Sequence, residues 1–593
     1  MENVTTAYTA NLVGQSSIFL NYLELNPSSK EYVRTSYSRA SFFTLVCRYA
    51  AMMKAQGIVK GSRAVHLFSC NTLHDLALRT ASVLLGSVPV TVNWGADTTE
   101  RILYKISKTG ASVIFTDGAS ADKFEFSKIK LSTTAVICNV DEVFEAGNFE
   151  PIQESEFVSL EGSDVRIIIF TSGTTGDPKG VELSYDNYKC NAKTFTAFLL
   201  EEVGGVNKIP IFNVVNPMHH TNSTSMTDWA LRTSTSTLNL FSQYSAKYWK
   251  CVNEVAEGRA ENSEVIMPLV SRHFDFLRDL VSGGKLPVKP AVLKENLSKC
   301  ILLLGSAPVG PTTVQTIQGL CGTLPTVRFG STETCLQVMG TPKPGVANGE
   351  RLAAFKKGWE HSRNGQDLCG YYIGRPHDGL TEVIIVKNCE KGKDGYMVEC
   401  EAGEPGLLVV KGRNVMKGYV SDPAATAKAF EEGWYVNLGD VCFYFPAGEG
   451  GSSKDVYWLS RESNLMIRGG TNYSYEQVNA ELTSFLEKEY HLEKGKVEVA
   501  VVGLKIDSEH EDSCCVTISL FDEDADRERV EATFLDRAKA SVSKGAKPTH
   551  FMFGQIPKTF KGSILTKDLV KRWEAEVEKK GVKQTRKKKP RVK

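Results

Sequence analysis

The hydrophobic pattern of the chain alternates between two periods. Short runs rich in β-branched residues predict buried strands. Longer segments with apolar residues three and four positions apart predict helices, most clearly Ser41–Ala55 and Thr99–Thr109. Strands that alternate with helices are typical of an α/β protein with largely parallel sheets. Examples of the strands that this pattern predicts are Ala64–Phe68, Ser112–Thr116, Ala135–Asn139, Val165–Phe170, Ile301–Leu304, Thr381–Val386, Leu407–Val410 and Val497–Val502.

Two segments interrupt this alternation. Pro446–Lys454 gathers Pro, Gly and Ser and predicts a loop, which a short strand, Val456–Leu459, and a polar stretch follow. After Trp573 the sequence becomes a charged helix and then a tail in which residues 583–593 include seven basic and no acidic side chains. Blocks of like charge are usually disordered. A solvated tail, a nuclear signal and a tether to an anionic surface all remain compatible with it.

Composition excludes several classes of protein. Of the 593 residues, 42% are hydrophobic and 23% charged, which excludes a wholly disordered or collagen-like chain. The 70 basic and 69 acidic residues give a net charge of +1, so nucleic-acid binding is not expected. The 14 cysteines are scattered without a C-x-x-C pair, which argues against a zinc ribbon or a secreted disulfide scaffold. With neither a signal peptide nor a transmembrane segment recognisable, a reducing, cytoplasmic location is expected.

The strongest local signal is a strand that runs directly into a loop of hydroxyls, glycines and one lysine. The residues after Ile167–Phe170 read T-S-G-T-T-G-D-P-K-G. Glycines permit backbone conformations that other residues avoid, so consecutive N–H groups can form an anion-binding concavity. The spacing differs from that of a Walker A loop. The segment therefore predicts a polyphosphate site composed of Thr171, Ser172, Gly173, Thr174, Thr175, Gly176 and Lys179.

This run resembles the T-S-G-[ST]-T-G-x-P-K-G signature of the adenylate-forming superfamily, which comprises acyl-CoA synthetases, firefly-type luciferases and nonribosomal peptide adenylation domains. Other segments match further motifs of that family in order, from about Ser41 to Leu569. Leu304–Pro308 is similar to S-G-[GS]-A-P, whose backbone lies along adenine in the family. The resemblance thus adds Gly305, Ser306 and Ala307 to the expected ATP site.

Two more segments in the middle of the chain carry the resemblance. Phe329–Thr334 resembles Y-G-x-T-E, which implies that Phe329 stacks on adenine beside Gly330 and Ser331, that Thr332 approaches the α-phosphate, and that Glu333 holds Mg²⁺. Pro217–Asn222 resembles P-[LM]-F-H-x-x-G. The resemblance implies that His220, Asn222, Ser223 and Met226 line the acyl pocket, and that His220 also has a catalytic role.

The C-terminal motifs match less completely. Trp434–Asp440 resembles G-W-x-x-T-G-D with Leu438 in place of Thr, which implies that Asp440 binds the ribose. Ser460–Gly470 resembles G-R-x-[DK]-D-x-I-x-x-x-G. It implies a ribose or phosphate contact at Arg461, a hinge at Ser463, and a thiol tunnel along Gly469 and Gly470. Gly418–Tyr419 matches a G-Y pair to which we assign an architectural role.

The segment Pro557–Lys567 departs from the family pattern at its catalytic residue. The family reads P-K-T-x-S-G-K, and Ser563 stands where its lysine does. Lys561, on the other side of Gly562, is expected to take the catalytic role. The other possibility is that adenylation is weakened.

The resemblance implies the following overall assignment. Residues 1–459 form a large AMP-binding domain of stacked mixed sheets sandwiched with helices, 460–575 form a small mobile α+β lid, and 576–593 form the basic tail. The expected activity is that of an AMP-forming acid–thiol ligase, most like an acyl-CoA synthetase, acting on a carboxylic acid with ATP, Mg²⁺ and coenzyme A. The alternatives are an adenylating enzyme with another acceptor, such as a carrier protein or a luciferase-like reaction, and a non-catalytic nucleotide- or acyl-binding relative.

Overall fold

The chain divides into two compact units. The first comprises Met1–Ala354, Ile373–Val383 and Val409–Asn437, and the second comprises Phe355–Tyr372, Ile384–Leu408 and Leu438–Lys593. The computed structural model describes residues 3–95, 97–121, 123–171, 178–201, 207–306, 308–342, 348–363, 365–447, 453–461, 464–468, 471–506, 512–521, 527–543, 545–559 and 562–579.

One sheet of the first unit carries the strand that leads into the phosphate loop. Its neighbours β4, β3, β5 and β6 run parallel to one another, and β7 pairs parallel with β4 and antiparallel with β8. Strands β4 and β5 are buried at every position and β7 at its four central positions, because helices cover a parallel sheet on both faces. In spatial order the strands are β20 (Gly418–Tyr419), β8 (Gly180–Ser184), β7 (Val165–Phe170), β4 (Val88–Thr91), β3 (Arg63–Leu67), β5 (Val113–Thr116) and β6 (Val136–Asn139).

The other large sheet of this unit has a parallel centre and antiparallel edges. Strands β1, β10, β9, β11, β12 and β13 pair in parallel in that order, while β2 and β14 pair antiparallel at the two sides. The strands are β2 (Tyr32–Ser38), β1 (Ile18–Leu25), β10 (Thr237–Phe241), β9 (Ile209–Val214), β11 (Ser263–Leu269), β12 (Ile301–Leu304), β13 (Thr326–Phe329), β14 (Met339–Gly340) and β17 (Tyr371–Pro376), whose last residues pair with β14.

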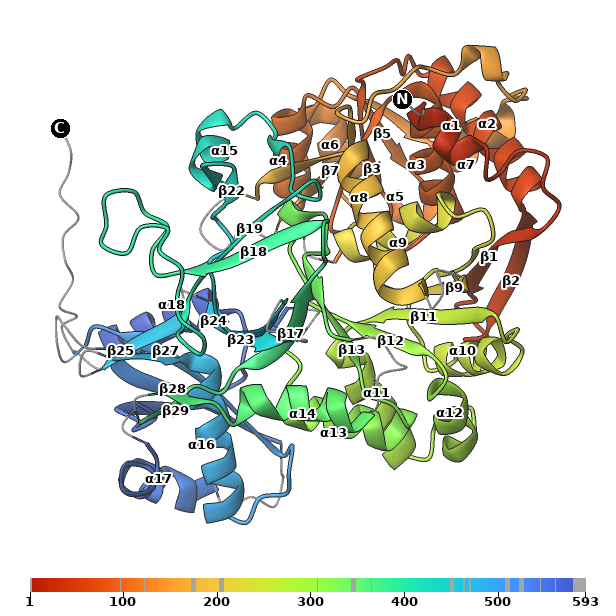
Figure 1. Ribbon diagram of the computed structural model, residues 1–593. Coiled ribbons are helices and arrows are strands. Elements are labelled where there is room, and N and C mark those ends of the chain that lie inside the picture. The colour runs from red at the N-terminus through yellow and green to blue at the C-terminus, as the bar shows by residue number, and fades with distance from the viewer. Residues whose placement is uncertain are drawn as a thin grey trace. The chain divides into compact units, whose positions relative to one another are not determined.

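Helices of the first unit pack beside these sheets. Helices α8 (Tyr185–Phe195) and α9 (Thr221–Leu231) lie side by side (Figure 1), and every residue of α9 is buried. The remaining helices are α1 (Val4–Thr9), α2 (Arg39–Ala55), α3 (Leu73–Leu85), α4 (Thr99–Thr109), α5 (Gly118–Ala121), α6 (Phe126–Ser132), α7 (Val140–Ala146), α10 (Tyr248–Glu257), α11 (Ser271–Ser282), α12 (Pro290–Leu297), α13 (Pro311–Cys321), α15 (Pro423–Ala429) and α14 (Asn348–Trp359), which continues into the second unit.

The second unit ends in an α+β fold with its own core. Strand β28 pairs antiparallel with β27 and parallel with β29, and α18 places Leu569, Trp573 and Val577 in the core at helical spacing. Its elements are β23 (Asp440–Ala447), β24 (Ser453–Arg461), β25 (Leu465–Arg468), β26 (Thr471–Ser474), α16 (Tyr475–Glu489), β27 (Val497–Leu504), β28 (Ser513–Leu520), α17 (Arg527–Ser541), β29 (His550–Phe553) and α18 (Thr566–Lys579), with the short strands β15 (Ser362–Arg363) and β16 (Gln366–Asp367). Strands β18 (Thr381–Val386) and β19 (Gly406–Gly412) contain residues of both units.

The structure confirms the predicted α/β class. Each strand and helix predicted from the hydrophobic pattern is present, with bounds that differ by a few residues at most. The prediction of a loop over Pro446–Lys454 is wrong at both ends, because Pro446 pairs with Lys454 in the β23–β24 hairpin and extends both strands. Ten of the 14 cysteines are buried, and the structure, which describes all 14, joins none of them in a disulfide. Among the described helices, none has the length and apolar character needed to cross a membrane.

Candidate active site

The two ends of the predicted phosphate loop are joined by hydrogen bonds. Thr171, directly after β7, donates its backbone N–H to the carbonyl oxygen of Lys179 over 3.0 Å, and its hydroxyl lies 3.4 Å from the same oxygen. The side chains of Thr171 and Lys179 are both partly exposed, as a phosphate-binding residue must be. The loop between them contains the predicted residues Ser172, Gly173, Thr174, Thr175 and Gly176, which lie outside the described residues.

Tyr419 connects Lys179 with Glu333. The Lys179 ammonium lies 4.9 Å from the centre of the Tyr419 ring, and the Tyr419 hydroxyl donates a 3.2 Å hydrogen bond to Glu333 Oε1. The Asn437 amide is 3.5 Å from the same hydroxyl oxygen, and Tyr435 Oη is 3.4 Å from it. A cation and a carboxylate that come from distant parts of the sequence therefore meet around one tyrosine.

The backbone after β13 explains how Glu333 is presented. Gly330 allows a close crossing, because a Cβ atom there would lie 1.8 Å from the carbonyl oxygen of Leu336. Residues 332–334 then form a short 3₁₀ turn, capped by a 2.8 Å bond from the Ser331 N–H to Thr334 Oγ1. The Met416 N–H donates to the Glu333 carbonyl over 2.6 Å. The turn is thus fixed from both sides, and the carboxylate remains partly exposed.

Tyr419 is the residue that the sequence interpretation missed. We assigned the Gly418–Tyr419 pair to architecture, and β20 does pair with β8 beside the phosphate loop. The side chain does more, since its buried hydroxyl touches the carboxylate predicted to hold the metal. Burial, together with the nearby Glu333 charge, raises the pKa of Tyr419 to about 12, so the hydroxyl is a neutral donor near pH 7. The G-Y pair in the sequence was the available signal.

Thr332 lies beside the first residue of α9, which directly follows His220 in the sequence. The Thr221 hydroxyl donates to Thr332 Oγ1 over 3.1 Å, which brings the predicted α-phosphate residue to the end of α9 where the acyl pocket is expected. His220 precedes the helix, and its Nε2 lies 3.1 Å from His219 Nε2. The other predicted acyl-pocket residues are buried in α9. Among them, Ser223 donates to the Asn216 carbonyl over 2.7 Å, and Met226 belongs to the hydrophobic core, while Asn222 is 4% exposed.

Arg328 lies so close to Gly305 that a side chain at this position would crowd it. A Cβ atom there would lie 2.9 Å from Arg328 Nη1 and 3.0 Å from the Arg328 carbonyl oxygen. Ser306 follows with a φ of 74° and an exposed side chain, so the chain turns sharply at the end of β12. Phe329, partly exposed, ends the neighbouring strand β13. The predicted adenine residues Gly305, Ser306 and Phe329 therefore lie at adjacent strand ends, while Ala307 falls outside the described residues.

The predicted ribose residues form a pair in the second unit. Asp440 is 1% exposed, accepts a 2.8 Å bond from Trp458 Nε1, and lies 2.8 Å from Arg461 Nε. Arg461 also donates to the Leu438 carbonyl over 2.7 Å while half of its side chain stays exposed. Its guanidinium is thus held in place yet accessible to an anionic ligand.

The remaining predicted residues of the second unit are Lys561, Ser463, Gly469 and Gly470, all outside the described residues. The described residues on either side of Lys561 are paired with one another. The Thr559 N–H donates to the Ser563 carbonyl over 2.8 Å, and Lys558 pairs with Ile564 in a β-bridge. Lys558 is paired with Glu498.

The donor set around Glu333 fits magnesium better than a tightly held structural metal. Within the described ranges, no three His, Cys, Asp or Glu side chains gather closely enough to hold a metal ion. Mg²⁺ commonly binds through one or two carboxylates and completes its shell with phosphate oxygens and water. One partly exposed carboxylate beside the predicted phosphate loop matches that requirement.

Proteins with sequences similar to this chain include acid–CoA ligases. The chain is 26% identical over 439 residues to the 2-succinylbenzoate–CoA ligase of Bacillus licheniformis, covering 73% of this chain and 76% of that ligase. It is 25% identical to the peroxisomal benzoate–CoA ligase of Arabidopsis thaliana, over 76% of this chain and 74% of that ligase.

Solved structures share the fold across nearly the whole chain. ATP-bound MatB from Rhodopseudomonas palustris superposes with a TM-score of 0.72 at 20% identity, over 97% of this chain and 99% of MatB. The o-succinylbenzoate CoA synthetase MenE of Bacillus subtilis, in complex with the acyl-adenylate OSB-AMP, gives 0.71 at 21% identity, over 96% and 98%. The sequence model of AMP-binding enzymes matches residues 20–420. The chain therefore belongs to the family of AMP-binding enzymes.

Proposed function

We propose that the protein activates a carboxylic acid with ATP and transfers the acyl group to coenzyme A. In the first step a carboxylate oxygen bonds to the α-phosphorus of ATP while the bond to pyrophosphate breaks, giving an acyl-adenylate. In the second step the thiol sulfur bonds to the acyl carbon, its proton leaves, and the bond to AMP breaks. The observation that carries this proposal is the meeting of Lys179 and Glu333 around Tyr419, beside the phosphate loop.

Each residue of this cluster has a distinct task. Lys179 supplies a positive charge to the β- and γ-phosphates of ATP, and Glu333 presents a carboxylate to Mg²⁺. The metal, when bound, neutralises charge on the phosphate oxygens. Tyr419 touches both side chains and fixes the direction of the Glu333 carboxylate through Oε1, so that Oε2 would be the oxygen that binds Mg²⁺. Phosphoryl-centre chemistry depends mainly on such positioning and charge stabilisation.

The proposal also assigns roles to residues of the second unit, in ribose binding and in the reaction with the thiol. Asp440 and Arg461 bind the ribose and the α-phosphate side of the nucleotide, and Lys561 meets the charge that develops between the carboxylate and the α-phosphorus. We propose the lid over residues 460–575, with a hinge at Ser463 and a thiol tunnel at Gly469 and Gly470. The absence of disulfides among cysteines that are mostly buried supports action in a reducing compartment such as the cytoplasm.

Two half-reactions, measured separately, test the proposal. The first is pyrophosphate release across a panel of aliphatic, aromatic and dicarboxylic acids without coenzyme A, and the second is thioester formation on addition of the thiol. We expect at least one acid to give both. Release of pyrophosphate without a thioester would identify another acceptor. Binding of ATP without pyrophosphate release from any acid would identify a non-catalytic relative.

Lys561→Ala addresses the departure from the family pattern. We expect it to suppress pyrophosphate release while largely sparing thioester formation from a supplied acyl-adenylate. Lys558→Ala is the matched control, because Lys558 lies only three residues earlier in the sequence and is paired with Glu498. Ser563→Lys in the Lys561→Ala background should recover part of the rate. Equal rates in wild type and Lys561→Ala would remove this residue from the mechanism.

A further inference from the structure

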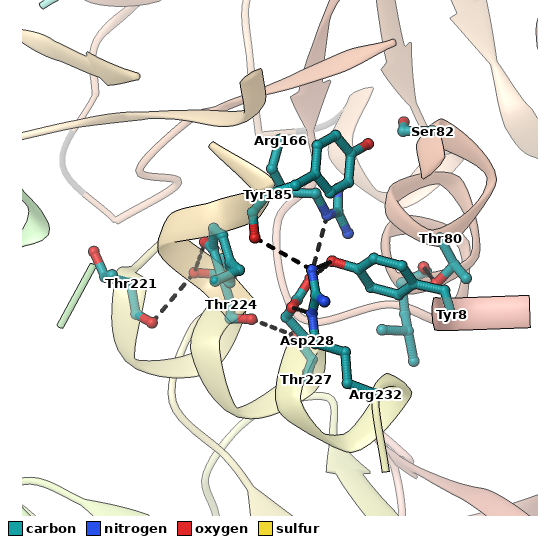
Figure 2. Close-up of polar contacts among 12 residues, drawn as sticks. Tyr8, Thr80, Ser82, Arg166, Tyr185, Thr221, Thr224, Thr227, Asp228 and Arg232 are labelled. Atoms are coloured by element: carbon teal, nitrogen blue, oxygen red, sulfur yellow. Dashed lines mark hydrogen bonds and ion pairs between the residues drawn. The ribbon is translucent and has the colours of Figure 1, made fainter. Parts of the chain in front are cut away.

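A network of buried charges lies between the strand that leads to the phosphate loop and helix α9 (Figure 2). Asp228 of α9 accepts bonds from Arg166 Nε at 3.2 Å, from Arg232 Nε at 2.8 Å and from the Tyr8 hydroxyl at 2.7 Å. Arg232 also reaches the Tyr8 oxygen at 2.6 Å and the Tyr185 carbonyl at 3.4 Å. Two guanidinium cations thus share one carboxylate.

A second buried ion pair adjoins this network. Arg79 of α3 binds Asp75 through two bonds of 2.7 and 3.0 Å, and Asp75 also binds His66 Nδ1 at 2.7 Å. Burial lowers the pKa of His66, so its ring is neutral near pH 7. Arg79 and Arg166 are only 4% and 5% exposed.

Both arginines line one small cavity. Its wall also contains Asp228, Tyr188, Thr224 and Thr227, and the centre of a water-sized particle has about 10 Å³ in which to lie, which is room for one water molecule or one small ion. Arg79 Nη1 and Arg166 Nη1 are buried and have no hydrogen-bond partner in the part of the chain that the structure describes. A buried N–H group of a cation that lacks a partner costs more than a neutral one, so this cavity favours an acceptor.

The charges of the network do not balance. Three guanidinium groups, those of Arg79, Arg166 and Arg232, face the two carboxylates of Asp75 and Asp228, which leaves one positive charge. The tyrosines do not compensate for it, because burial raises the pKa of Tyr8, of Tyr185 and of Tyr188, and each stays protonated. An uncompensated buried charge is strongly unfavourable.

We propose that this cavity binds one small monovalent anion, a halide such as chloride, between Arg79 and Arg166. A single negative charge neutralises the network and supplies the acceptor that the two Nη1 atoms require. The ion is structural: it joins α3, β7 and α9 in the core of the first unit. Because α9 begins at Thr221, which is hydrogen-bonded to Thr332, and β7 ends at Phe170, directly before Thr171, the ion fixes two elements that carry the proposed active site.

The test uses the purified full chain, exchanged into sodium gluconate and titrated with sodium chloride at constant ionic strength. We expect the unfolding temperature to rise with the logarithm of chloride concentration, by about 2 °C or more at 100 mM. Crystals grown in chloride should show a long-wavelength anomalous peak within hydrogen-bond distance of both Nη1 atoms.

Variants separate this site from a general salt effect. Arg166→Met removes the excess positive charge, so its unfolding temperature should no longer respond to chloride. Arg63→Met is the control, because Arg63 lies on the same sheet but pairs with Glu182 at a partly exposed place, and it should keep the response. Should Arg166→Met fail to fold, the anomalous peak in the wild-type crystal decides. An electron-density peak in the cavity without anomalous signal, or equal unfolding temperatures in gluconate and chloride, would overturn the proposal.

Discussion

Removal of one hydroxyl group, in Tyr419→Phe, should impair adenylation without disturbing the fold. The ring that stacks beside Lys179 is retained, while the donor to Glu333 Oε1 is lost. The carboxylate then rotates more freely and presents a metal ligand for a smaller fraction of the time. We therefore expect a lower rate of pyrophosphate release and a higher Mg²⁺ concentration at half-saturation, with KM for the carboxylic acid little changed.

The Tyr419–Glu333 hydrogen bond gives the expected size of the fall in rate. A hydrogen bond to a charged acceptor contributes about 1.5–3 kcal/mol. The 3.2 Å distance is long for an O–H···O bond, so the lower end applies. Since 1.36 kcal/mol is about tenfold in rate, pyrophosphate release should fall about tenfold. No change in the pH profile between pH 6 and 9 is expected, because the pKa of Tyr419 is held near 12 by burial and by Glu333.

A double-mutant cycle with Glu333→Gln tests the reasoning. If Tyr419 acts through Glu333, the Tyr419→Phe substitution should lower the rate of pyrophosphate release much less in the Glu333→Gln background than in the wild type. The expected coupling energy is about 1 kcal/mol. Tyr435→Phe is the matched control, since it removes a phenol oxygen 3.4 Å from Tyr419 Oη and should change the rate far less. Strictly additive effects of Tyr419→Phe and Glu333→Gln would refute a positioning role.

Three further changes test other parts of the account. Lys179→Ala should raise KM for ATP about tenfold or more with little change in unfolding temperature, because the side chain is partly exposed; isothermal titration with ATP checks this. Gly305→Ala should weaken ATP binding, because its Cβ would lie 2.9 Å from Arg328 Nη1, whereas Gly319→Ala, with open space around it, should not. Burial lowers the pKa of His377 to about 4, so the unfolded state binds more protons between that value and about 6.5. The unfolding free energy should therefore fall as pH drops from 7 to 4, and urea unfolding of His377→Gln should show a weaker decline.

Local patterns in the sequence were sufficient to predict part of the secondary structure. The β-branched runs and the helical spacing predicted strands and helices to within a few residues, because burial imposes the same periods in any α/β protein. Pairing across a hairpin is not local, and this is why Pro446 and Lys454 lie in strands where Pro, Gly and Ser composition predicted a loop.

The candidate site was predictable in its motifs but not in its contacts. Lys179 and Glu333 were chosen from separate motifs, and their shared neighbour Tyr419 became evident only when β20 was seen to pair with β8. The charge network around Asp228 was missed for the same reason. Tyr8, Arg79, Arg166 and Asp228 come from distant segments, and no motif indicates that they meet.

Isotope transfer from the acid to AMP tests the central claim most directly. A carboxylic acid that gives pyrophosphate release is labelled with ¹⁸O in both carboxylate oxygens and incubated with the protein, ATP, Mg²⁺ and coenzyme A. Attack of the carboxylate on the α-phosphorus leaves one labelled oxygen in the released AMP, so mass spectrometry should find AMP heavier by one ¹⁸O substitution. Unlabelled AMP, or label in inorganic phosphate with ADP as the product, would contradict adenylation.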